Sequence, residues 1–272
     1  MKLRVAAACI VLFVFAGTAL CQNIETTSTS SLGASLGVTD FHEKDKYLSH
    51  LPFRGIIFAS GISYQLATES SRHRIDGFFS SGNLNTDVPS RDLTQYVGSL
   101  SYSFVHAIAS SELAGHPLEF FLGGGVSSFV ANTDFVAPDE WNPYYDQSWY
   151  WSHSLNLILR SDYRVGERSS IAVECSMPMV RFVSRPDNGH WLSSKNGEVS
   201  DNFLNAAGQG KIEYAWENLV LLTSVEYRTP LSEQVDFRGS YQFGYVSSDK
   251  PHPEISMGMY MNRLLVGIDL QL

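Results

Sequence analysis

The sequence predicts an all-β fold: a single antiparallel up-and-down transmembrane β-barrel of about ten strands, within a range of roughly eight to twelve. Three observations support this prediction. Segments of strand length alternate between apolar and polar residues, so that each has one apolar face. Their connections alternate between short and long. Aromatic residues make up 12% of the chain, and Trp149 and Tyr163 stand at opposite ends of one segment, as two interfacial girdles require.

Ten segments carry the alternation. Strands are expected over residues 31–39, 53–66, 72–81, 93–108, 118–130, 149–163, 171–179, 219–228, 235–245 and 257–272. Short connections are expected at 68–71, 109–117, 164–168 and 229–232, and long ones at 40–52, 82–92, 132–147, 184–211 and 247–256. Membrane barrels keep short turns on the periplasmic side, so an even strand number places both chain ends there. A soluble β-sandwich is the weaker reading, because its strands are usually shorter.

Residues 1–21 have the composition of a secretory signal peptide. Lys2 and Arg4 precede an apolar segment, Ala6 to Ala16, that is too short to cross a bilayer as a helix. We therefore expect residues 1–21 to be cleaved and residues 22–272 to form the barrel. A lipoprotein acylated at the last leader residue is the weaker alternative, because the residue before that cysteine is a bulky leucine.

Cleavage changes the charge and the cysteine content. It leaves 17 basic and 28 acidic residues, a net charge of −11. An acidic chain argues against nucleic-acid binding, which needs basic surface to displace counterions. Cleavage also removes Cys9 and Cys21, so Cys175 is left alone and an intrachain disulfide is excluded.

The last strand alternates clearly. From Tyr260 to Leu272 the even positions are nearly all apolar, whereas the odd positions include Arg263, Gly267 and Asp269. A glycine followed at alternate positions by apolar residues, here Gly267, Leu270 and Leu272, resembles the C-terminal strand of Gram-negative outer-membrane β-barrel proteins. The resemblance concerns architecture only and implies no particular activity. It implies location in the cell outer membrane, contact with its lipids, insertion by the barrel assembly machinery and a monomeric state.

The faces opposite the apolar ones contain charged residues of both signs, often two positions apart. The residues expected to point into the lumen are Arg160, Asp162, Glu174, Glu226, Arg228, Asp236, Arg238, Arg263 and Asp269. A barrel of about ten strands is only slightly wider than an eight-stranded one, whose side chains nearly fill it. Because unpaired buried charges are costly, we expect a connected ion-pair network that plugs the lumen and conducts ions poorly.

Two histidines are candidates for a catalytic role. Outer-membrane phospholipases and lipid A deacylases place a histidine two residues before a serine on one strand face. Here Ser154 follows His153 directly and so lies on the opposite face, and Leu155 takes the required position. His153 is therefore expected at the membrane interface, beside the tryptophans, and His106 similarly at the end of its strand.

Acidic residues in the long loops are candidates for a protease active site or a metal-binding site. Ten-stranded outer-membrane proteases place Asp pairs and an Asp–His pair at the outer rim. The spacing of Asp134, Asp139, Asp146 and His190 does not match that motif. The carboxylates of Asp134, Asp139, Glu140 and Asp146 could bind a divalent cation, but they do not have the spacing of a cation-binding loop. These residues are expected to form a charged surface.

Two further groups have simple structural interpretations. The aromatic residues Tyr144, Tyr145, Trp149, Tyr150 and Trp151 suit an interfacial belt better than a carbohydrate or lipid platform. The alternating Met257, Met259 and Met261 suit soft core filling better than a metal site.

The sequence therefore predicts an outer-membrane barrel with a structural, binding or surface-interaction role. We expect no enzymatic activity and no cofactor, and we assign no catalytic, cofactor-binding or metal-ligating residue. An extracellular ligand is not identified. The alternatives are a lipid-modifying enzyme of the lipase or deacylase type and a small passive channel.

Overall fold

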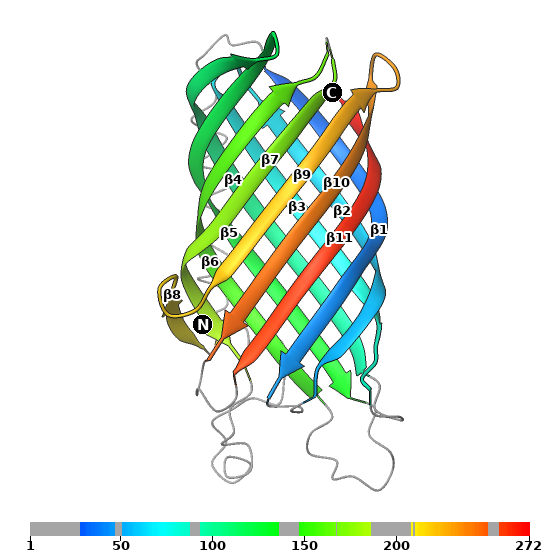
Figure 1. Cartoon of the computed structure of the whole chain (residues 1–272), viewed down its shortest axis with the longest axis vertical. Coiled ribbons are helices and arrows are strands. Elements are labelled where there is room, and N and C mark those ends of the chain that lie inside the picture. The colour runs from blue at the N-terminus through cyan, green and yellow to red at the C-terminus, as the bar shows by residue number, and fades with distance from the viewer. Residues whose placement is uncertain are drawn as a thin grey trace, which may run out of the picture.

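A computed structural model describes residues 28–46, 51–87, 93–135, 147–166, 168–185, 208, 210–249 and 256–272, which form one closed β-barrel (Figure 1). The strands are β1 (Thr29–Asp45), β2 (Phe53–Ala67), β3 (Ser71–Leu84), β4 (Leu93–Leu113), β5 (His116–Phe135), β6 (Gln147–Arg164), β7 (Ser170–Ser184), β8 (Lys211–Tyr214), β9 (Val220–Pro230), β10 (Val235–Ser248) and β11 (Met257–Gln271). Among these residues, none belongs to a helix that is long and apolar enough to cross a membrane.

All neighbouring strands are antiparallel. The order is β6-β5-β4-β3-β2-β1-β11-β10-β9-β7-β8, and pairing of β6 with β7 closes the barrel. The short β8 and the longer β9 both run antiparallel to β7, so they run in the same direction along it. Together they form one interrupted strand, and ten strands surround the lumen. The predicted all-β, ten-stranded barrel is confirmed.

The interruption lies opposite an irregularity in β7. Pro178 pairs with Asn156 and Val180 with Leu155, so Met179 is one extra residue, a β-bulge. Proline has no N–H for the ladder and is found in sheets at edges and bulges. The backbone N–H of Ala215, in the interruption, donates to the carbonyl of Met179 at 3.0 Å. We had expected residues up to 211 to be irregular and so did not predict β8.

The apolar residues of the strands face outward along part of their length. On β11, Leu264, Val266 and Ile268 are more than half exposed, whereas Leu265 and Asp269 are buried. Register pairs Leu32 with Leu270 and Val38 with Leu264. We call the outward band between these two pairs of residues, continued around the barrel, the apolar belt. The predicted register of the last strand is confirmed.

The two ends of the barrel differ. The short connections 68–70, 114–115, 165–169 and 231–234 lie at one end together with Leu272, and we call it the turn end (top of Figure 1). The opposite end, where β1 and β10 finish and β2 and β11 begin, is called the loop end.

Several predicted strand limits were wrong, always because the strands are longer. β1 continues to Asp45, where we had expected a loop from residue 40, and β4 and β5 meet in a two-residue turn, where we had expected a connection over 109–117. Ala114 and Gly115 both have positive φ, 53° and 80°, as the tight hairpin turn of this kind requires. The strands continue past the apolar belt, where outward residues are polar, so an apolar face is a poor guide to their ends.

The interior at the loop end is an apolar core, not the polar lumen that we had expected throughout. We call the buried residues of this core the apolar plug: Phe41, Phe53, Ile57, Leu84, Leu93, Val97, Ala131, Tyr150, Val183, Val220, Val246, Met257, Met259 and Met261. On β1 the outward residues beyond the belt, His42 and Lys44, are polar, and the apolar Phe41 turns inward and packs as in a soluble protein.

Candidate functional site

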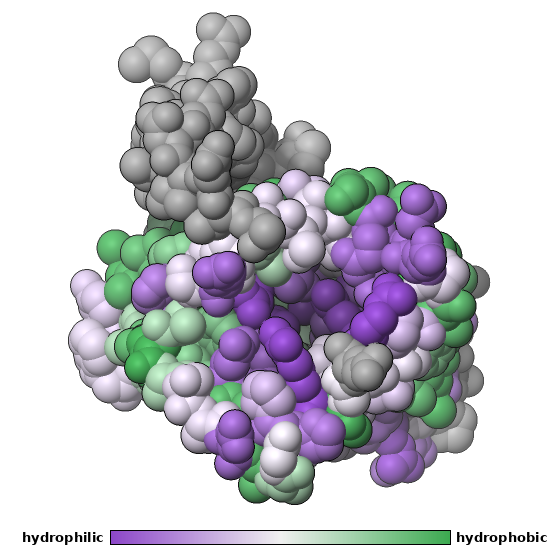
Figure 2. All heavy atoms as spheres, turned by 90° about the horizontal axis from the view of Figure 1, so that it is seen from above, coloured by the Kyte–Doolittle hydropathy of each residue, from purple (hydrophilic) through white to green (hydrophobic). Residues whose placement is uncertain are grey.

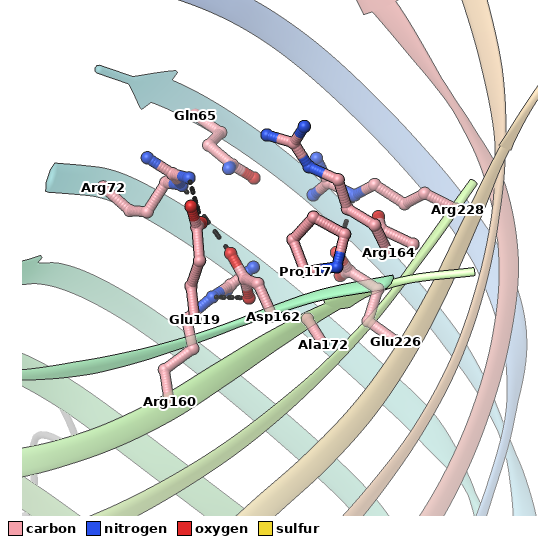
Figure 3. Close-up of a pocket in the computed structure, with 11 residues that line it drawn as sticks. Gln65, Arg72, Pro117, Glu119, Arg160, Asp162, Arg164, Ala172, Glu226 and Arg228 are labelled. Atoms are coloured by element: carbon pink, nitrogen blue, oxygen red, sulfur yellow. Dashed lines mark hydrogen bonds and ion pairs between the residues drawn. The ribbon is translucent and has the colours of Figure 1, made fainter. Parts of the chain in front are cut away.

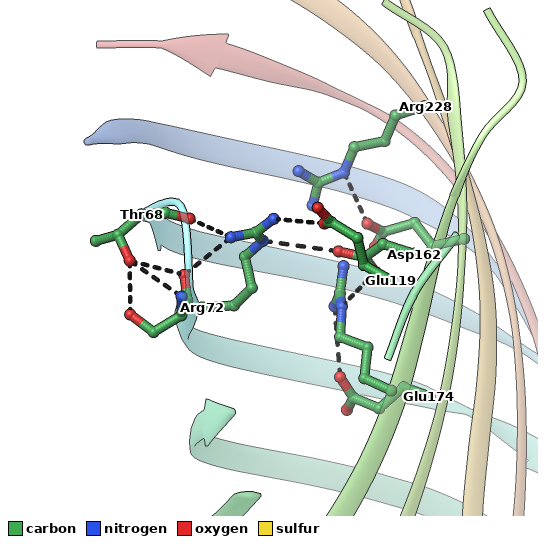
Figure 4. A network of polar contacts seen from close by, with 9 residues as sticks. Thr68, Arg72, Glu119, Asp162, Glu174 and Arg228 are labelled. Atoms are coloured by element: carbon green, nitrogen blue, oxygen red, sulfur yellow. Dashed lines mark hydrogen bonds and ion pairs between the residues drawn. The ribbon is translucent and has the colours of Figure 1, made fainter. Parts of the chain in front are cut away.

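Charged side chains fill the lumen on the turn-end side of the plug. Arg72 lies 3.4 Å from Glu119 and 3.6 Å from Asp162 (Figure 4). Arg160 contacts Asp162 at 2.7 Å and Glu174 at 3.4 Å. These ion pairs join β3, β5, β6 and β7, and Arg72 also donates to the turn carbonyls before it.

A second group of ion pairs crosses the lumen. Arg74 contacts Asp76 at 2.8 Å on its own strand and Glu226 at 3.1 Å. Arg228 contacts Glu226 at 2.7 Å and Asp269 at 3.3 Å. Arg74 is on β3 and Glu226 is on β9, which lies five strands away in either direction around the ten-stranded wall. A 3.1 Å contact between opposite walls bridges the lumen at this level.

Arg238 completes this second group. It lies 3.3 Å from Asp269, and its Nη1 donates to the Ser63 hydroxyl at 2.5 Å. Gly33 makes room for these side chains, because a Cβ there would lie 2.1 Å from the Asp269 carboxylate and 2.6 Å from the Ser63 hydroxyl. We call the two groups of ion pairs the arginine network.

A cavity of about 180 Å³ opens from the arginine network toward the turn end (Figure 3). Hydrophilic side chains surround a central hollow when the barrel is seen from that end (Figure 2). The lining includes four arginines and three carboxylates: Arg72, Arg160, Arg164, Arg228, Glu119, Asp162 and Glu226. The carboxylates are all engaged by arginines, so this polar recess ends at ion pairs.

Buried polar contacts also cross the lumen at the loop end. Arg185 Nη2 lies 2.6 Å from Asp45 Oδ1, and the Ser148 hydroxyl donates to Asp45 Oδ2 at 3.0 Å. Ser148 is on β6 and Asp45 on β1, again five strands apart in either direction. Arg181 pairs with Glu213 and donates to the Tyr150 hydroxyl at 3.0 Å. The Arg181 and Glu213 side chains are only 2% and 0% exposed, so this pair is dry.

Glu43 lies in the same region, beyond the apolar belt, where the outward neighbours on β1 are His42 and Lys44. Its carboxyl is buried and accepts from the Thr133 hydroxyl at 3.3 Å. Burial, and then the nearby negative charge of Asp45, raise the pKa of Glu43 to about 8, although Arg185 opposes this. Glu43 is therefore protonated at neutral pH.

A polar cluster lies on the outer surface of the barrel, just beyond the apolar belt. His42 Nε2 is 3.0 Å from Asp40 Oδ1, and His42 Nδ1 is 2.8 Å from the Tyr260 hydroxyl, with the two rings stacked at 4.2 Å. Asn262 Nδ2 donates to Asp40 at 3.4 Å, and the Tyr241 hydroxyl donates to Asn262 Oδ1 at 2.8 Å. We call these five residues the surface cluster. Its Asp–His–hydroxyl contacts can in principle support general-base chemistry.

The predicted lumen residues are where the sequence placed them. All nine face inward. Seven join the ion pairs described above, Asp236 accepts from Gln271 at 2.6 Å, and Arg263 donates to Gln242 at 2.6 Å. Arg72, Arg74 and Asp76 were not predicted as lumen residues, although they also alternate with opposite charges. The buried charges of the loop end were not predicted either, because the expected strands were too short.

His153 and Ser154 are on opposite faces, as predicted. The His153 ring faces outward, 6.1 Å from the Trp151 ring and 6.4 Å from the Phe182 ring. Ser154 faces inward, 2.7 Å from the Ser127 hydroxyl. The outward position of His153 beside Trp151 is confirmed. Exposed His106 lies within β4, which continues to Leu113, and not at a strand end.

The other candidates have mixed outcomes. The core-filling role of Met257, Met259 and Met261 is confirmed by their burial. Trp149 and Trp151 alternate with Tyr150, which was wrongly placed in the belt: it points inward to Arg181. Asp134 is half-buried near Asn132 Nδ2. Outside the described residues lie Asp139, Glu140, Tyr144, Tyr145, Asp146, His190 and the proposed leader.

Comparisons with known proteins place the fold. The chain matches no family model, and no curated protein sequence matches it. It is similar to the outer membrane protease OmpT from Escherichia coli, with a TM-score of 0.53 and 10% identity over 92% of this chain and 99% of that one. It is also similar to Neisserial surface protein A, with a TM-score of 0.35 and 14% identity over 89% of this chain and 96% of that one. For the translocator domain of the autotransporter NalP from Neisseria meningitidis, the TM-score is 0.37 and the identity is 11%, over 98% of this chain and 97% of that one.

One expectation is corrected by these comparisons. We had expected no enzymatic activity, but the solved barrel that shares this fold at a TM-score of 0.53 is a protease. At 10% identity the likeness shows the fold alone. The architecture therefore gives no ground for excluding an enzyme, and an activity has to be argued from side chains.

Proposed function

We propose that this chain, which is an outer-membrane β-barrel, is a closed, non-conducting barrel with a structural, binding or surface-interaction role. The proposal rests on the contacts that cross the lumen. Arg74–Glu226 and Ser148–Asp45 each join strands five positions apart, at 3.1 Å and 3.0 Å. The apolar plug lies between these two levels. A solute would have to break a buried ion pair and open an apolar core.

The remaining parts of the proposal concern assembly. The habit of membrane barrels supports a turn end in the periplasm and a loop end outside. The composition of residues 1–21 supports a cleaved leader in a Gram-negative cell, and the terminal pattern of Gly267, Leu270 and Leu272 supports insertion by the barrel assembly machinery. Complete pairing of the barrel wall supports a monomer, because it leaves no free edge along the barrel.

Ion conduction tests the proposal. Purified protein reconstituted in a planar bilayer is expected to give rare, small openings. A lumen variant, Arg74→Ala with Glu226→Ala, is the matched comparison, because it removes the contact between opposite walls while the plug remains. We expect the variant to stay closed as well. A steady, large conductance of the unmodified protein at low voltage would contradict the proposal and favour the passive channel.

A second candidate function is modification of outer-leaflet lipids, and the surface cluster favours it. His42 is held between the Asp40 carboxylate and the Tyr260 hydroxyl, on the lipid-facing side of the barrel, directly beyond the apolar belt. A histidine oriented by a carboxylate can take a proton from a hydroxyl or a water that attacks an ester. The position suits a substrate whose ester lies at headgroup level.

Hydrolysis of ester phospholipids in mixed micelles tests this second candidate. The informative variant is His42→Asn, and His153→Asn is the matched control, because His153 is also an outward interfacial histidine but has Trp151 and Phe182 as its ring neighbours. We expect His42→Asn to lose activity by at least about 100-fold, the usual contribution of a general base, and the control to keep it. Equal activity in the two variants, or none in the unmodified protein, would reject this function.

A further inference from the structure

Arg263 differs from the arginines of the arginine network. It lies on β11, facing inward at the edge of the apolar belt, between Met261 of the plug and buried Leu265. Its Nη1 donates to Gln242 Oε1 at 2.6 Å, and its guanidinium lies over the Phe78 ring, 3.1 Å from the centroid. Its Nε, although buried, meets no acceptor in the described part of the chain.

The arginines of the arginine network are charge-compensated. Each of Arg72, Arg74, Arg160, Arg228 and Arg238 has a carboxylate within 3.6 Å. Arg263 has none within ion-pair distance among the described residues. A guanidinium carries five N–H donors and no acceptor. Leaving such a charge uncompensated away from bulk water is among the costlier arrangements in a protein, so a counter-charge is expected beside it.

A cavity of about 200 Å³ lies beside Arg263, between the plug and the arginine network. Its lining is rich in hydroxyl groups that can donate hydrogen bonds, among them Ser99, Ser101, Ser103, Ser224 and Ser240. The carboxylates that reach it, Asp76 and Glu174, are held by Arg74 and Arg160. The space accommodates a few waters and one small ion, each water taking roughly 30 Å³.

We infer that this cavity binds one small monovalent anion of the halide class, held by Arg263 N–H groups and serine O–H groups. The donor set suits an anion, because Arg263 supplies positive charge and the hydroxyls can all turn toward it. A halide fits a cavity of this size together with a few waters. The bound ion supplies the counter-charge of Arg263. This inference is independent of the binding or lipid-modifying role proposed above.

Crystals of the full protein grown with bromide in place of chloride test the inference directly. We expect an anomalous bromide peak within hydrogen-bond distance of the Arg263 guanidinium. The Arg263→Met variant is expected to lose that peak, and Arg263→Lys, which keeps the charge, to retain it. A cavity that contains water only in the unmodified protein, or a peak that persists in Arg263→Met, would overturn the inference.

Thermal unfolding gives a second readout in solution. Chloride is titrated against gluconate, an organic anion outside the halide class, at constant ionic strength. The unmodified protein is expected to gain a few degrees in Tm as chloride rises, because an ion that binds only the folded state stabilises it. Arg263→Met is expected to lose this shift, and Arg72→Met, which removes an arginine paired with carboxylates, to keep it. The same chloride dependence in Arg263→Met and the unmodified protein would contradict the assignment.

Discussion

The two halves of the barrel interior are closed by opposite kinds of interaction. On the turn-end side, arginines and carboxylates from seven strands meet across the lumen and border a polar recess. On the loop-end side, apolar side chains fill the interior and only dry, fully enclosed polar pairs such as Arg181–Glu213 remain.

The difference follows from what surrounds the wall at each level. Within the apolar belt the outward residues are apolar, so the polar residues of the same strands must point inward. Beyond the belt, outward residues such as His42 and Lys44 are polar, and the inward neighbour Phe41 packs in a core. The chain thus reverses its inside and outside composition along single strands, as a membrane protein at one end and as a soluble β-protein at the other.

The largest effect is expected from breaking the dry pair at the loop end. Arg181→Met leaves the Glu213 carboxylate buried without its charge partner, which typically costs about 3–5 kcal/mol. The free energy of unfolding, measured in urea with lipid vesicles, checks this. Adding Glu213→Gln to Arg181→Met is the control and is expected to recover much of the loss. An Arg181→Met variant as stable as the unmodified protein would show that the pair is hydrated.

A similar but smaller loss is expected in the apolar plug. Met259 is fully buried, so Met259→Ala removes packed methylenes and leaves a cavity, at a cost of about 2–5 kcal/mol. The matched control is Leu264→Ala on the outer face of the same strand, where the side chain is 56% exposed and faces the belt. Unfolding free energies that rank the two variants in reverse order would contradict the apolar core at the loop end.

A weaker, salt-sensitive effect is expected in the arginine network. The Arg72 side chain is 15% exposed and borders the open recess. Arg72→Met is expected to cost about 1–3 kcal/mol at low salt, the range for hydrogen bonds to charged groups, and less in 1 M salt. The loss in Arg181→Met is expected to be independent of salt. Unfolding titrations of both variants at two salt concentrations distinguish the wet pairs from the dry ones.

A further effect concerns Glu43 and depends on pH. Its pKa is about 8 in the folded barrel and near 4.5 in the unfolded chain, so the folded state binds the extra proton between these values. Its contribution to stability is complete below pH 4.5 and is lost as pH rises through 8. We therefore expect Glu43→Gln to match the unmodified protein at pH 5 and to be more stable at pH 9. Unfolding free energies at the two pH values check this, and parallel pH curves would contradict it.

The sequence was informative inside the belt and misleading beyond it. The alternation of Leu264, Val266 and Ile268 with Leu265 and Asp269 was enough to predict the register of β11 and the inward arginines. The same criterion, an outward apolar face, predicted that the first strand ends at residue 39. The inward positions of Phe41 and of the buried charges Glu43 and Asp45 were therefore not predicted.

Other features depended on contacts distant in the chain. Neither the contact between Arg74 and Glu226 nor that between Asp45 and Ser148 follows from local spacing, because opposite walls meet only once the strand number and the pairing order are known. The surface cluster is similar. His42 and Asp40 are two residues apart, but Tyr260 joins them only through the pairing of the first strand with the last.

Thiol accessibility tests the contrast between the two halves most directly. In a background with Cys175→Ser, a single cysteine is introduced either at Gln65, beside the turn-end recess, or at Met259, in the apolar plug. A small charged methanethiosulfonate reagent is then applied to the folded protein from both sides. We predict rapid modification of the Gln65→Cys variant and protection of the Met259→Cys variant until the barrel is unfolded. Equal rates at the two positions would show that water and ions reach both halves, and would contradict a wet ion-pair layer closed by a dry plug.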